Sequence, residues 1–268
     1  MNRRHQPINR KPDGAVRAKK ALGQHFLTDQ NIARNTAEAI RLEAGRKVLE
    51  VGPGMGVLTQ YLLEHPINLH VVEIDRDSVA YLNTHFPALQ GRIIEADFLR
   101  LPLERYLDEQ GAVIGNFPYN ISSQILFHCL DHLEVVEEIC GMFQKEVAER
   151  IASIHGNKTY GILSVVLQTW YDCEYLFTVH EHVFQPPPKV KSAVIRLRRK
   201  SENHLKVPKP FFMQVVKMAF NQRRKTLRNA LRPMLHAEHR AEQWLHLRAE
   251  QLSIAEFHQL AEALYRHD

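Results

Sequence analysis

The tetrapeptide Asn116-Phe117-Pro118-Tyr119 carries residue types that suit chemistry on a nucleobase, and it directly follows the apolar run of residues 112–115. An amide oxygen and a neighbouring backbone carbonyl can together accept both N–H groups of an exocyclic amine. The proline fixes its own φ and stiffens the turn, while the tyrosine ring offers a flat face to a base that has left its stack. Asn and Pro are also ordinary turn residues between a strand and a helix, so this segment alone leaves both interpretations open.

A glycine-rich turn upstream favours the first interpretation. Gly52, Gly54 and Gly56 follow the apolar run of residues 48–51, and a helical pattern comes after them. Glycines allow a tight turn and a close approach of the backbone to a ligand, as in nucleotide-binding α/β folds. The third glycine comes one residue too early for a dinucleotide fingerprint, and Glu50 would repel a pyrophosphate at a helix N-terminus. S-adenosylmethionine carries a sulfonium and an ammonium group but no phosphate, so it fits this turn better.

Two further carboxylates stand where later apolar runs end. Glu73 comes about 20 residues after Gly52, the usual distance for an acid that binds ribose hydroxyls. Asp97 ends a third run, where it can accept from an adenine amine. Each acid taken singly is more often a solvated residue after a strand. Because ligands of parallel sheets bind at the carboxyl ends of the strands, three acids and Asn116 predict one rim that holds both cofactor and target base.

The elements that must position these residues alternate regularly. Apolar runs typical of strands are separated by helical patterns, the first of which covers residues 30–44. This order predicts an α/β doubly wound, mostly parallel sheet of the Rossmann-like kind. The predicted strands lie near residues 47–51, 69–74, 92–95, 112–115 and 138–143. An alternating run over residues 192–197 predicts a late strand at an edge of the same sheet.

Beyond this sheet the sequence changes character. Residues 201–210 are polar and contain two prolines, which is typical of a linker, and residues 211–268 show only helical patterns. Three parts are therefore predicted: a flexible basic N-terminal arm over residues 1–20, a Rossmann-like domain over residues 21–200 and a helical domain over residues 201–268.

Composition limits the classes of protein that need to be considered. Hydrophobic residues make up 44% of the 268 residues, yet no apolar run reaches the ~18 residues of a membrane helix. The N-terminus has charges but lacks the apolar stretch of a signal peptide. Three cysteines have no metal-ligand spacing, and the 16 histidines are scattered. We therefore expect a cytoplasmic protein with reduced, buried thiols, without a metal site and without membrane association.

Basic residues are concentrated in two places within a chain of net charge +5. The arm carries seven Lys and Arg residues before Ala21 against one acid, Asp13, and it is either a nucleic-acid contact or a solvated tail. The second group follows helical spacing, so we expect it along one helix face as a ridge that follows RNA phosphates. A solvated surface is the alternative. The residues of this face are Lys217, Arg224, Lys225 and Arg228, and the neighbouring Arg223 is also expected to bind RNA.

With these motifs in hand, the chain resembles the KsgA-type ribosomal RNA adenine dimethyltransferases. The resemblance runs in family order from Leu22 to beyond Asn229. Its departures are His25, where many members have Asn, and Phe117, where many have Leu. The matching segments are residues 22–27, 50–56, 116–122, 144–150, 184–192 and 220–229.

The resemblance implies a specific reaction and partner. Members of the family use S-adenosylmethionine, which becomes S-adenosylhomocysteine, to dimethylate N6 of two adjacent adenosines in the 3′-terminal hairpin of 16S rRNA. It further implies a monomer that acts on a 30S assembly intermediate and takes part in small-subunit biogenesis. The target adenine is expected to stack between Tyr119 and Phe184. Carried over from the family, the cofactor site consists of His25, Leu27, Gly52, Glu73, Asp97 and Asn116, to which the glycine turn adds Gly54.

The chemistry needs little acid–base machinery. Hydrogen bonds from the amine to Asn116 Oδ1 and the Phe117 carbonyl favour a tetrahedral nitrogen whose lone pair points at the methyl group. Alignment and electrostatic placement then supply most of the acceleration, and we nominate no general base. Two other functions are kept: an Erm-type enzyme that methylates 23S rRNA, and a small-subunit assembly factor that has kept the fold without the activity. The intact Asn-x-Pro-Tyr and glycine motifs argue against lost catalysis.

Overall fold

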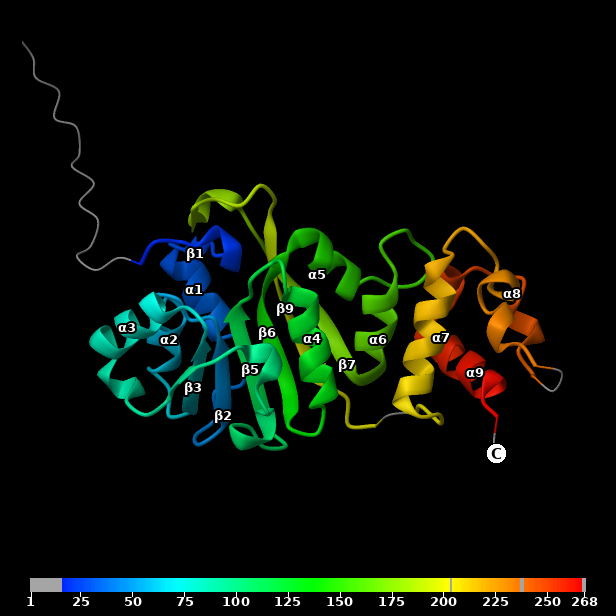
Figure 1. The fold of residues 1–268 in the computed structure, drawn as a ribbon, viewed down its shortest axis with the longest axis horizontal. Coiled ribbons are helices and arrows are strands. Elements are labelled where there is room, and N and C mark those ends of the chain that lie inside the picture. Colours follow the sequence, from blue (N-terminus) through cyan, green and yellow to red (C-terminus); the bar gives the residue numbers. More distant parts are fainter. Residues whose placement is uncertain (1–15, 203, 237–238, 267–268) are drawn as a thin grey trace, which may run out of the picture.

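The computed structural model describes residues 16–202, 204–236 and 239–266. Its centre is a seven-stranded sheet with the strand order β4-β3-β2-β5-β6-β9-β7 (Figure 1). A separate two-stranded antiparallel sheet joins β1 (Phe26–Leu27) to β8 (Phe184–Gln185). The strands of the large sheet are β2 (Lys47–Val51), β3 (Asn68–Glu73), β4 (Ile93–Glu95), β5 (Gly111–Asn116), β6 (Val136–Gln144), β7 (Tyr171–Val179) and β9 (Ser192–Arg199).

The order of the strands creates a switch point in the middle of the sheet. From β2 the chain moves outward to β3 and β4, and then returns to the other side of β2 to form β5 and β6. These five strands pair in parallel. In open α/β sheets, ligands bind at the carboxyl ends of the strands beside such a reversal. The predicted α/β, mostly parallel Rossmann-like fold is confirmed.

Helices cover both faces of the sheet, and the pleat decides which face each strand residue serves. Leu49 and Val113 belong to one apolar core, whereas their neighbours Val48 and Ala112 belong to the other. The first core includes residues of α4 (Ser122–Asp131), α5 (Lys145–Ile151) and α6 (Ile162–Trp170). The second includes residues of α1 (Gln30–Ala37), α2 (Thr59–Leu62) and α3 (Arg76–His85). Short 3-10 turns lie at Lys20–Leu22, Pro87–Leu89, Phe98–Arg100, Leu103–Arg105 and Glu181–Val183.

The C-terminal part is helical over the residues that the structure describes there, as predicted. Its first helix lies next to α6 (Figure 1), and the Trp170 and Phe212 rings meet edge to face with centroids 5.8 Å apart. Phe212 and Phe257 therefore belong to the same apolar core as the sheet residues Val113 and Ile139. The elements are α7 (Lys209–Asn221), α8 (Leu227–Ala230) and α9 (Ile254–Leu264), with 3-10 turns at Arg232–Met234, Glu242–Trp244 and Ala249–Gln251.

The late strand is longer than predicted and lies elsewhere in the sheet. β9 pairs antiparallel with β6 on one side and with β7 on the other. The expectation of an edge strand at residues 192–197 is therefore wrong, because β7 occupies that edge. β7 was not predicted, because it carries polar residues such as Asp172 and Glu174 among its apolar ones.

The first helix is shorter than predicted, since α1 ends at Ala37 and not near residue 44. Backbone groups that would have continued it have other partners. The Arg41 N–H donates to Glu138 Oε2 at 3.1 Å, and the Ala39 carbonyl accepts from Arg196 at 2.9 Å. Glu138 is fully buried and also binds Arg46 at 2.6 Å. The segment after α1 is therefore bound to the sheet near the start of β6.

The basic residues predicted on one helix face do not share one. α7 ends at Asn221, so Lys217 lies on α7, Arg224 and Lys225 lie in the following turn, and Arg228 lies on α8. The helix cannot continue because the N–H groups of residues 227 and 228 donate to the carbonyls of residues 247 and 245, at 2.7 and 2.9 Å.

Most of the predicted basic arm, residues 1–15, lies outside the described residues. Its last residues belong to the folded part. Lys20 begins a 3-10 turn, and the Lys19 ammonium forms ion pairs with Asp75 and, at 2.7 Å, with Asp77.

The three cysteines of the chain are free thiols, of which Cys129 and Cys140 are buried and Cys173 is half-buried. Burial raises the pKa of Cys129 and Cys140 far above the ordinary value and that of Cys173 to about 12. Within the described ranges, no three His, Cys, Asp or Glu side chains come together as a possible metal site. No helix in the same part of the chain has the length and apolar character needed to cross a membrane.

Candidate functional site

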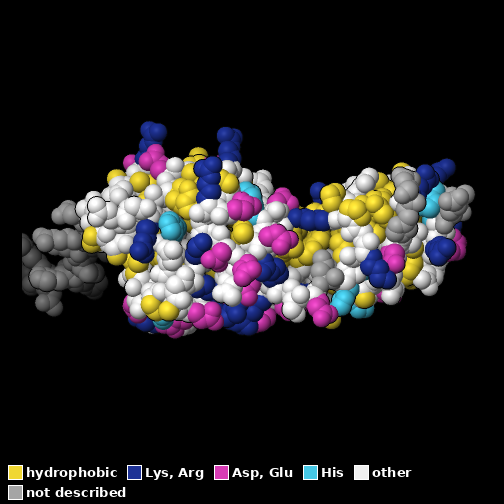
Figure 2. All heavy atoms as spheres, turned by 90° about the horizontal axis from the view of Figure 1, so that it is seen from below, with side chains coloured by type: hydrophobic (Ala, Val, Ile, Leu, Met, Phe, Trp, Pro, Cys, Tyr) yellow, Lys and Arg dark blue, Asp and Glu magenta, His cyan; other side chains and the backbone are white. Residues whose placement is uncertain are grey.

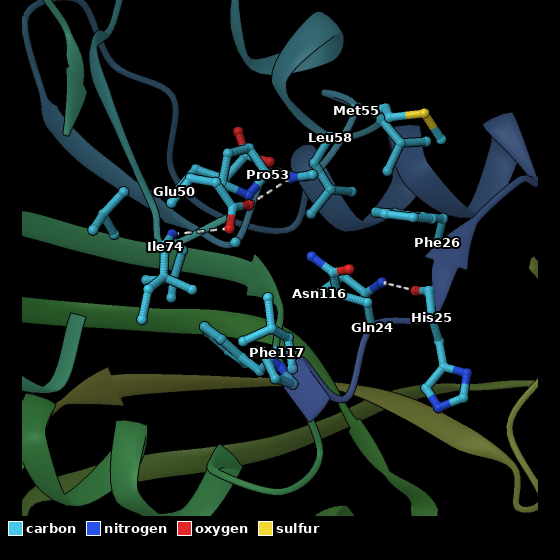
Figure 3. A pocket seen from close by; sticks show the side chains of 18 of the residues that line it. Gln24, His25, Phe26, Glu50, Pro53, Met55, Leu58, Ile74, Asn116 and Phe117 are labelled. Atoms are coloured by element: carbon cyan, nitrogen blue, oxygen red, sulfur yellow. Dashed lines mark hydrogen bonds between the residues drawn. The ribbon is translucent and has the colours of Figure 1, made fainter. Parts of the chain in front are cut away.

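A cavity of about 630 Å³ opens at the carboxyl ends of β2, β3 and β5, beside the switch point. Its size falls in the usual range for a nucleoside-sized ligand. Figure 3 shows Phe26, Met55 and Leu58 near one another and Ile74 apart from them, with Asn116 between. The structure brings the following predicted residues together in its wall: His25, Leu27, Gly52, Gly54, Glu73, Asp97, Asn116, Phe117, Pro118 and Tyr119.

The Glu73 carboxylate is held by backbone N–H groups around it. Oε1 accepts from Ile74 and Asp75, both at 2.9 Å, and Oε2 accepts from Gly54 at 3.1 Å. Only 5% of Glu73 is exposed, and this burial raises the pKa of its carboxyl group. A carboxylate offers about four acceptor positions, so three bonds fix its orientation and leave capacity for a hydroxyl donor.

The glycine turn shapes the floor of the cavity. Gly52 and Gly54 have φ values of +66° and +56°, which side chains rarely adopt. A Cβ at Gly54 would lie 2.8 Å from the Phe26 ring, whereas a Cβ at Gly52 would meet no atom within 4 Å. Gly52 therefore presents bare backbone to open space, which is a cradle that a bound ligand can fill.

Glu50 lies beneath this turn and differs from the sequence expectation in its charge. Its carboxyl group accepts a hydrogen bond from the Thr59 hydroxyl at 2.6 Å, and 1% of the residue is exposed. Burial raises the pKa of Glu50 to about 8. In the ligand-free protein Glu50 is therefore mostly neutral at pH 7, and a cationic ligand nearby would favour its ionised form.

Asp97 has one oxygen engaged and one near solvent. Oδ1 accepts from the Leu99 N–H at 3.0 Å and caps the turn that follows β4. Oδ2 lies 3.6 Å from Arg100 Nε in an exposed ion pair. Exposed pairs of this kind contribute little, so Oδ2 can accept from an amine donor in the cavity.

The two ends of the Asn116 amide have different surroundings. Nδ2 donates to the His25 carbonyl at 2.9 Å, as the dashed line in Figure 3 marks. Since the nitrogen is bound to the protein, Oδ1 remains as the acceptor of this side chain. Asn116 ends β5 directly at the cavity wall, which places Oδ1 where a substrate amine can reach it.

Phe117 and Tyr119, the residues on either side of Pro118, are both held by packing against neighbouring elements. The Phe117 ring lies on Gly115 and Gly141, where an added Cβ would stand 3.0 and 2.5 Å from it. The Tyr119 hydroxyl makes a short hydrogen bond with Ser192, and its ring stacks on His25 with centroids 5.5 Å apart. This packing holds the turn in one conformation at the cavity wall.

Phe184 lies apart from the cavity wall, whereas Tyr119, with which it was expected to stack the target adenine, is part of that wall. It pairs with Leu27 across the two-stranded sheet, is 3% exposed and belongs to the apolar core on the α1 side. The structure therefore does not place Tyr119 and Phe184 on two sides of one open slot. His25 is the ring that faces Tyr119 here, and its Nδ1 lies 2.8 Å from the Pro186 carbonyl.

The predicted RNA-binding residues lie away from the cavity, around α7 and α8. Lys217, Arg224 and Lys225 are exposed, and Arg223 donates to the Asn157 carbonyl at 3.3 Å. Arg228 differs from them because it forms an ion pair with Glu242. A shallow pocket beside Lys225 is lined by further polar residues, and no acid is among those described for it: Asn221, Gln222, Asn229 and Arg232.

Sequence reasoning missed several residues of the site. Lys19, Gln24 and Asp75 form a hydrogen-bonded group next to Glu73, and Ile74 is 53% exposed at the cavity. Ile74 and Asp75, directly after the glutamate predicted to bind ribose, were visible in the sequence. The long-range partner Lys19 was not, because 56 positions separate it from Asp75.

Sequence comparisons match almost the whole chain. A family model described as ribosomal RNA adenine dimethylase matches residues 15–265. The chain is 54% identical over 254 residues to the ribosomal RNA small subunit methyltransferase A of Parabacteroides distasonis, which covers 94% of this chain and 96% of that protein. The protein of the same name from Flavobacterium johnsoniae is 54% identical over 244 residues, covering 90% and 94%.

Solved structures share the fold at lower identity. A dimethyladenosine transferase from Plasmodium falciparum has a TM-score of 0.76 at 21% identity, covering 88% of this chain and 96% of that one. The 23S rRNA methyltransferase ErmE has a TM-score of 0.69 at 24% identity, covering 89% and 99%.

Proposed function

The chain belongs to the ribosomal RNA adenine dimethylase family, and from this premise we propose that it dimethylates N6 of two adjacent adenosines in the 3′-terminal hairpin of 16S rRNA. The observation that carries the proposal is the Asn116 amide. Its nitrogen is bound to the His25 carbonyl, and its oxygen is left as an acceptor in the same cavity wall that holds Glu73. A base-amine acceptor and a nucleoside-binding rim thus share one cavity.

The residues of the cavity fit S-adenosylmethionine as the cofactor, with S-adenosylhomocysteine as the product. Glu73 would accept from its ribose hydroxyls and Asp97 from its adenine amine, and the bare backbone of Gly52 supplies the cradle. His25, Leu27 and Gly54 complete the expected contacts. When bound, this group supplies an electrophilic methyl group on a sulfonium.

The protein's own contribution to the reaction is orientation. The lone pair of an adenine amine is delocalised into the ring, so the nitrogen is a poor nucleophile. Asn116 Oδ1 and the Phe117 carbonyl accept its two N–H groups and favour a tetrahedral nitrogen with a directed lone pair. Tyr119 holds the base by stacking, and the family resemblance adds Phe184 as the second ring. After alkylation the nitrogen is acidic enough to lose its proton to water, so no general base is assigned.

The choice of RNA comes from surfaces outside the cavity, because an adenine-binding turn can accept any unstacked adenine. We assign this choice to a C-terminal RNA-recognition domain, residues 201–268, through Lys217, Arg223, Arg224, Lys225 and Arg228. The part of the predicted arm before Lys19 assists it, whereas Lys19 and Lys20 belong to the folded part. The partner is small-subunit rRNA within a 30S assembly intermediate in the cytoplasm. The protein acts as a monomer and supports subunit biogenesis.

The test is methyl incorporation from labelled cofactor into two RNA substrates offered separately. We expect labelling of undermethylated small subunits, confined to N6 of two adjacent adenosines, and none of protein-free 23S rRNA. Labelling of the 23S rRNA alone would replace the proposal with the Erm-type reaction. Labelling of neither substrate by folded, cofactor-binding protein would leave an assembly factor without chemistry.

A further inference from the structure

Residues 19–25, here called the N-terminal strap, run along the cavity between its two functional halves. Residues 21–25 of the strap line the cavity. Lys19, at the first end of the strap, and Gln24 both contact Asp75, which follows the Glu73 strand, and His25, at the second end, contacts Asn116. The strap therefore connects the side expected to hold the cofactor with the side expected to hold the target amine.

The first end is anchored on a buried carboxylate. The Asp75 side chain is 1% exposed, and it receives the Lys19 ammonium and, at 3.1 Å, the Gln24 amide nitrogen. The Gln24 amide oxygen accepts from the Lys19 N–H at 2.8 Å, so Gln24 closes the turn between the two residues. Asp75 also donates its own N–H to Glu73 Oε1 at 2.9 Å, which links the anchor directly to the predicted ribose carboxylate.

The second end is fitted to the catalytic turn. The His25 carbonyl receives the Asn116 amide at 2.9 Å. Gly23, with a φ of +64°, lies so close to Asn120 that a Cβ would stand 2.6 Å from its Oδ1. Gln24 directly precedes His25 in the chain, so its bond to Asp75 restrains the backbone next to the His25 carbonyl. The His25 ring contacts with Tyr119 and the Pro186 carbonyl restrain the residue from its other side.

We infer that Lys19 and Gln24 are positioning residues for methyl transfer. By fixing the strap on Asp75 they hold the His25 carbonyl against Asn116 Nδ2, and this contact selects the amide orientation in which Oδ1 is free for the amine. The inference rests on the proposed function of Asn116. A misplaced acceptor slows alignment-dependent catalysis without preventing substrate binding.

The decisive variants are Lys19→Ala and Gln24→Met, with Lys19→Arg as the conservative replacement. Lys20→Ala is the matched control, because it removes the same charge one residue later from an exposed side chain. Lys19 is 42% exposed but its partner Asp75 is 1% exposed, so Lys19→Ala leaves a buried carboxylate without its ammonium and lowers stability. Circular dichroism and thermal unfolding therefore confirm that each variant is folded before kcat is compared.

At saturating RNA and cofactor, Lys19→Ala and Gln24→Met should lower kcat by about tenfold to a hundredfold. Lys19→Arg should restore most of it, and Lys20→Ala should leave kcat unchanged. An equal rise in the KM for RNA in Lys19→Ala and Lys20→Ala, with normal kcat, would reduce Lys19 to a surface charge. Loss of cofactor affinity with normal kcat at saturation would make the strap a cofactor contact only.

A second measurement does not depend on the identity of the RNA. In protein labelled with ¹⁵N-asparagine, the Asn116 side-chain amide can be assigned from the signal that Asn116→Ser removes. We expect slow hydrogen exchange of this amide in the wild type and in Lys20→Ala, and faster exchange in Lys19→Ala and Gln24→Met. Equal exchange in all four proteins would overturn the inference even if methylation proceeds as proposed. Inactivity of the wild type on every RNA, with the exchange pattern as expected, would instead count against the proposed function alone.

Discussion

Asn116 is the residue whose chemical role follows most directly from sequence and structure together, because the orientation of its amide is fixed. An asparagine amide has two donors and one acceptor oxygen, and its orientation is ambiguous unless one end is bound. Here the His25 carbonyl binds the nitrogen end at 2.9 Å. The acceptor end is thereby committed to the cavity before substrate arrives, which is the preorganisation that electrostatic catalysis requires.

Asn116→Ala should abolish methyl transfer while the protein stays folded. The variant removes the acceptor that we propose acts on the reacting nitrogen, and this loss should cost on the order of 3 kcal/mol or more in the barrier. Single-turnover rates on small subunits give the barrier, and calorimetry with S-adenosylmethionine gives the cofactor affinity, which should change little. Near-normal turnover by folded Asn116→Ala would refute the role assigned to this residue.

Glu50 leads to a prediction about pH. Its pKa is raised to about 8 by burial, and a cationic ligand lowers it by favouring the carboxylate. Binding of S-adenosylmethionine at pH 7 should therefore release protons, and affinity should rise with pH until about pH 8 and then level off. Calorimetry in two buffers of different ionisation enthalpy measures the protons released.

The matched control is Glu50→Gln, which keeps a side-chain oxygen for the Thr59 hydroxyl. The pKa of the neighbouring Glu73 is also raised, so the variant is needed to separate the two acids. Glu50→Gln should release fewer protons and show a flatter pH dependence. The same proton release in both proteins would assign the effect to Glu73.

At the scale of the elements, the local sequence was sufficient to predict those strands and rim residues that depend on apolar periodicity and on their order in the chain. The five parallel strands and the rim residues between Gly52 and Asn116 were predicted in this way. The place of β9 was not predicted, because the polar residues of β7 hid the strand that takes the edge and because β9 pairs with β6, which is distant in the chain. The end of α7 was hidden for a similar reason. Residues 211–232 contain neither glycine nor proline, and the break comes from backbone bonds to residues 245 and 247.

The broken helix changes what is expected of its basic residues. Lys217, Arg224 and Lys225 are exposed, whereas Arg228 is paired with Glu242. Single neutralising substitutions of the first three should each lower the log–log salt slope of RNA binding by roughly 0.7 to 0.9 if that residue contacts a phosphate. Arg228→Ala should change the slope less, because RNA binding there must first displace Glu242.

Filter binding over a range of salt concentrations measures these slopes, and S-adenosylmethionine affinity should stay constant in all four variants. Unchanged slopes for the three exposed residues would return this surface to ordinary solvated side chains. If Arg228→Ala lowers the salt slope as much as the other three substitutions do, the ion pair between Arg228 and Glu242 does not survive in the RNA complex.

At the scale of the whole molecule, the C-terminal helices and the sheet share one apolar core. Trp170 of α6 packs against Phe212 of α7, and hydrophobic side chains gather over α6, α7 and α9 on the face seen in Figure 2. The separation into domains 21–200 and 201–268 suggests two independent units, whereas a continuous core favours cooperative unfolding.

The two tryptophans of the chain allow this to be tested. Trp170 reports on α6, and Trp244 reports on the C-terminal helices, where it is 7% exposed. Trp244→Phe and Trp170→Phe each leave one reporter. We expect denaturant unfolding followed by either tryptophan to coincide with the loss of helical circular dichroism of the same variant. A transition of Trp244 at clearly lower denaturant would show that the C-terminal part unfolds by itself.

The buried thiols have a practical consequence for the chemistry of labelling. Alkylating reagents attack the thiolate, and an exposed cysteine has a pKa of about 8.5. In this protein burial raises the pKa of Cys173 to about 12 and those of Cys129 and Cys140 still further. A cysteine introduced at the exposed position of Lys20 should therefore react much faster than the three natural ones. One fluorophore or spin label could then be placed beside the cavity in an otherwise unaltered chain, to follow the arrival of cofactor and RNA in real time.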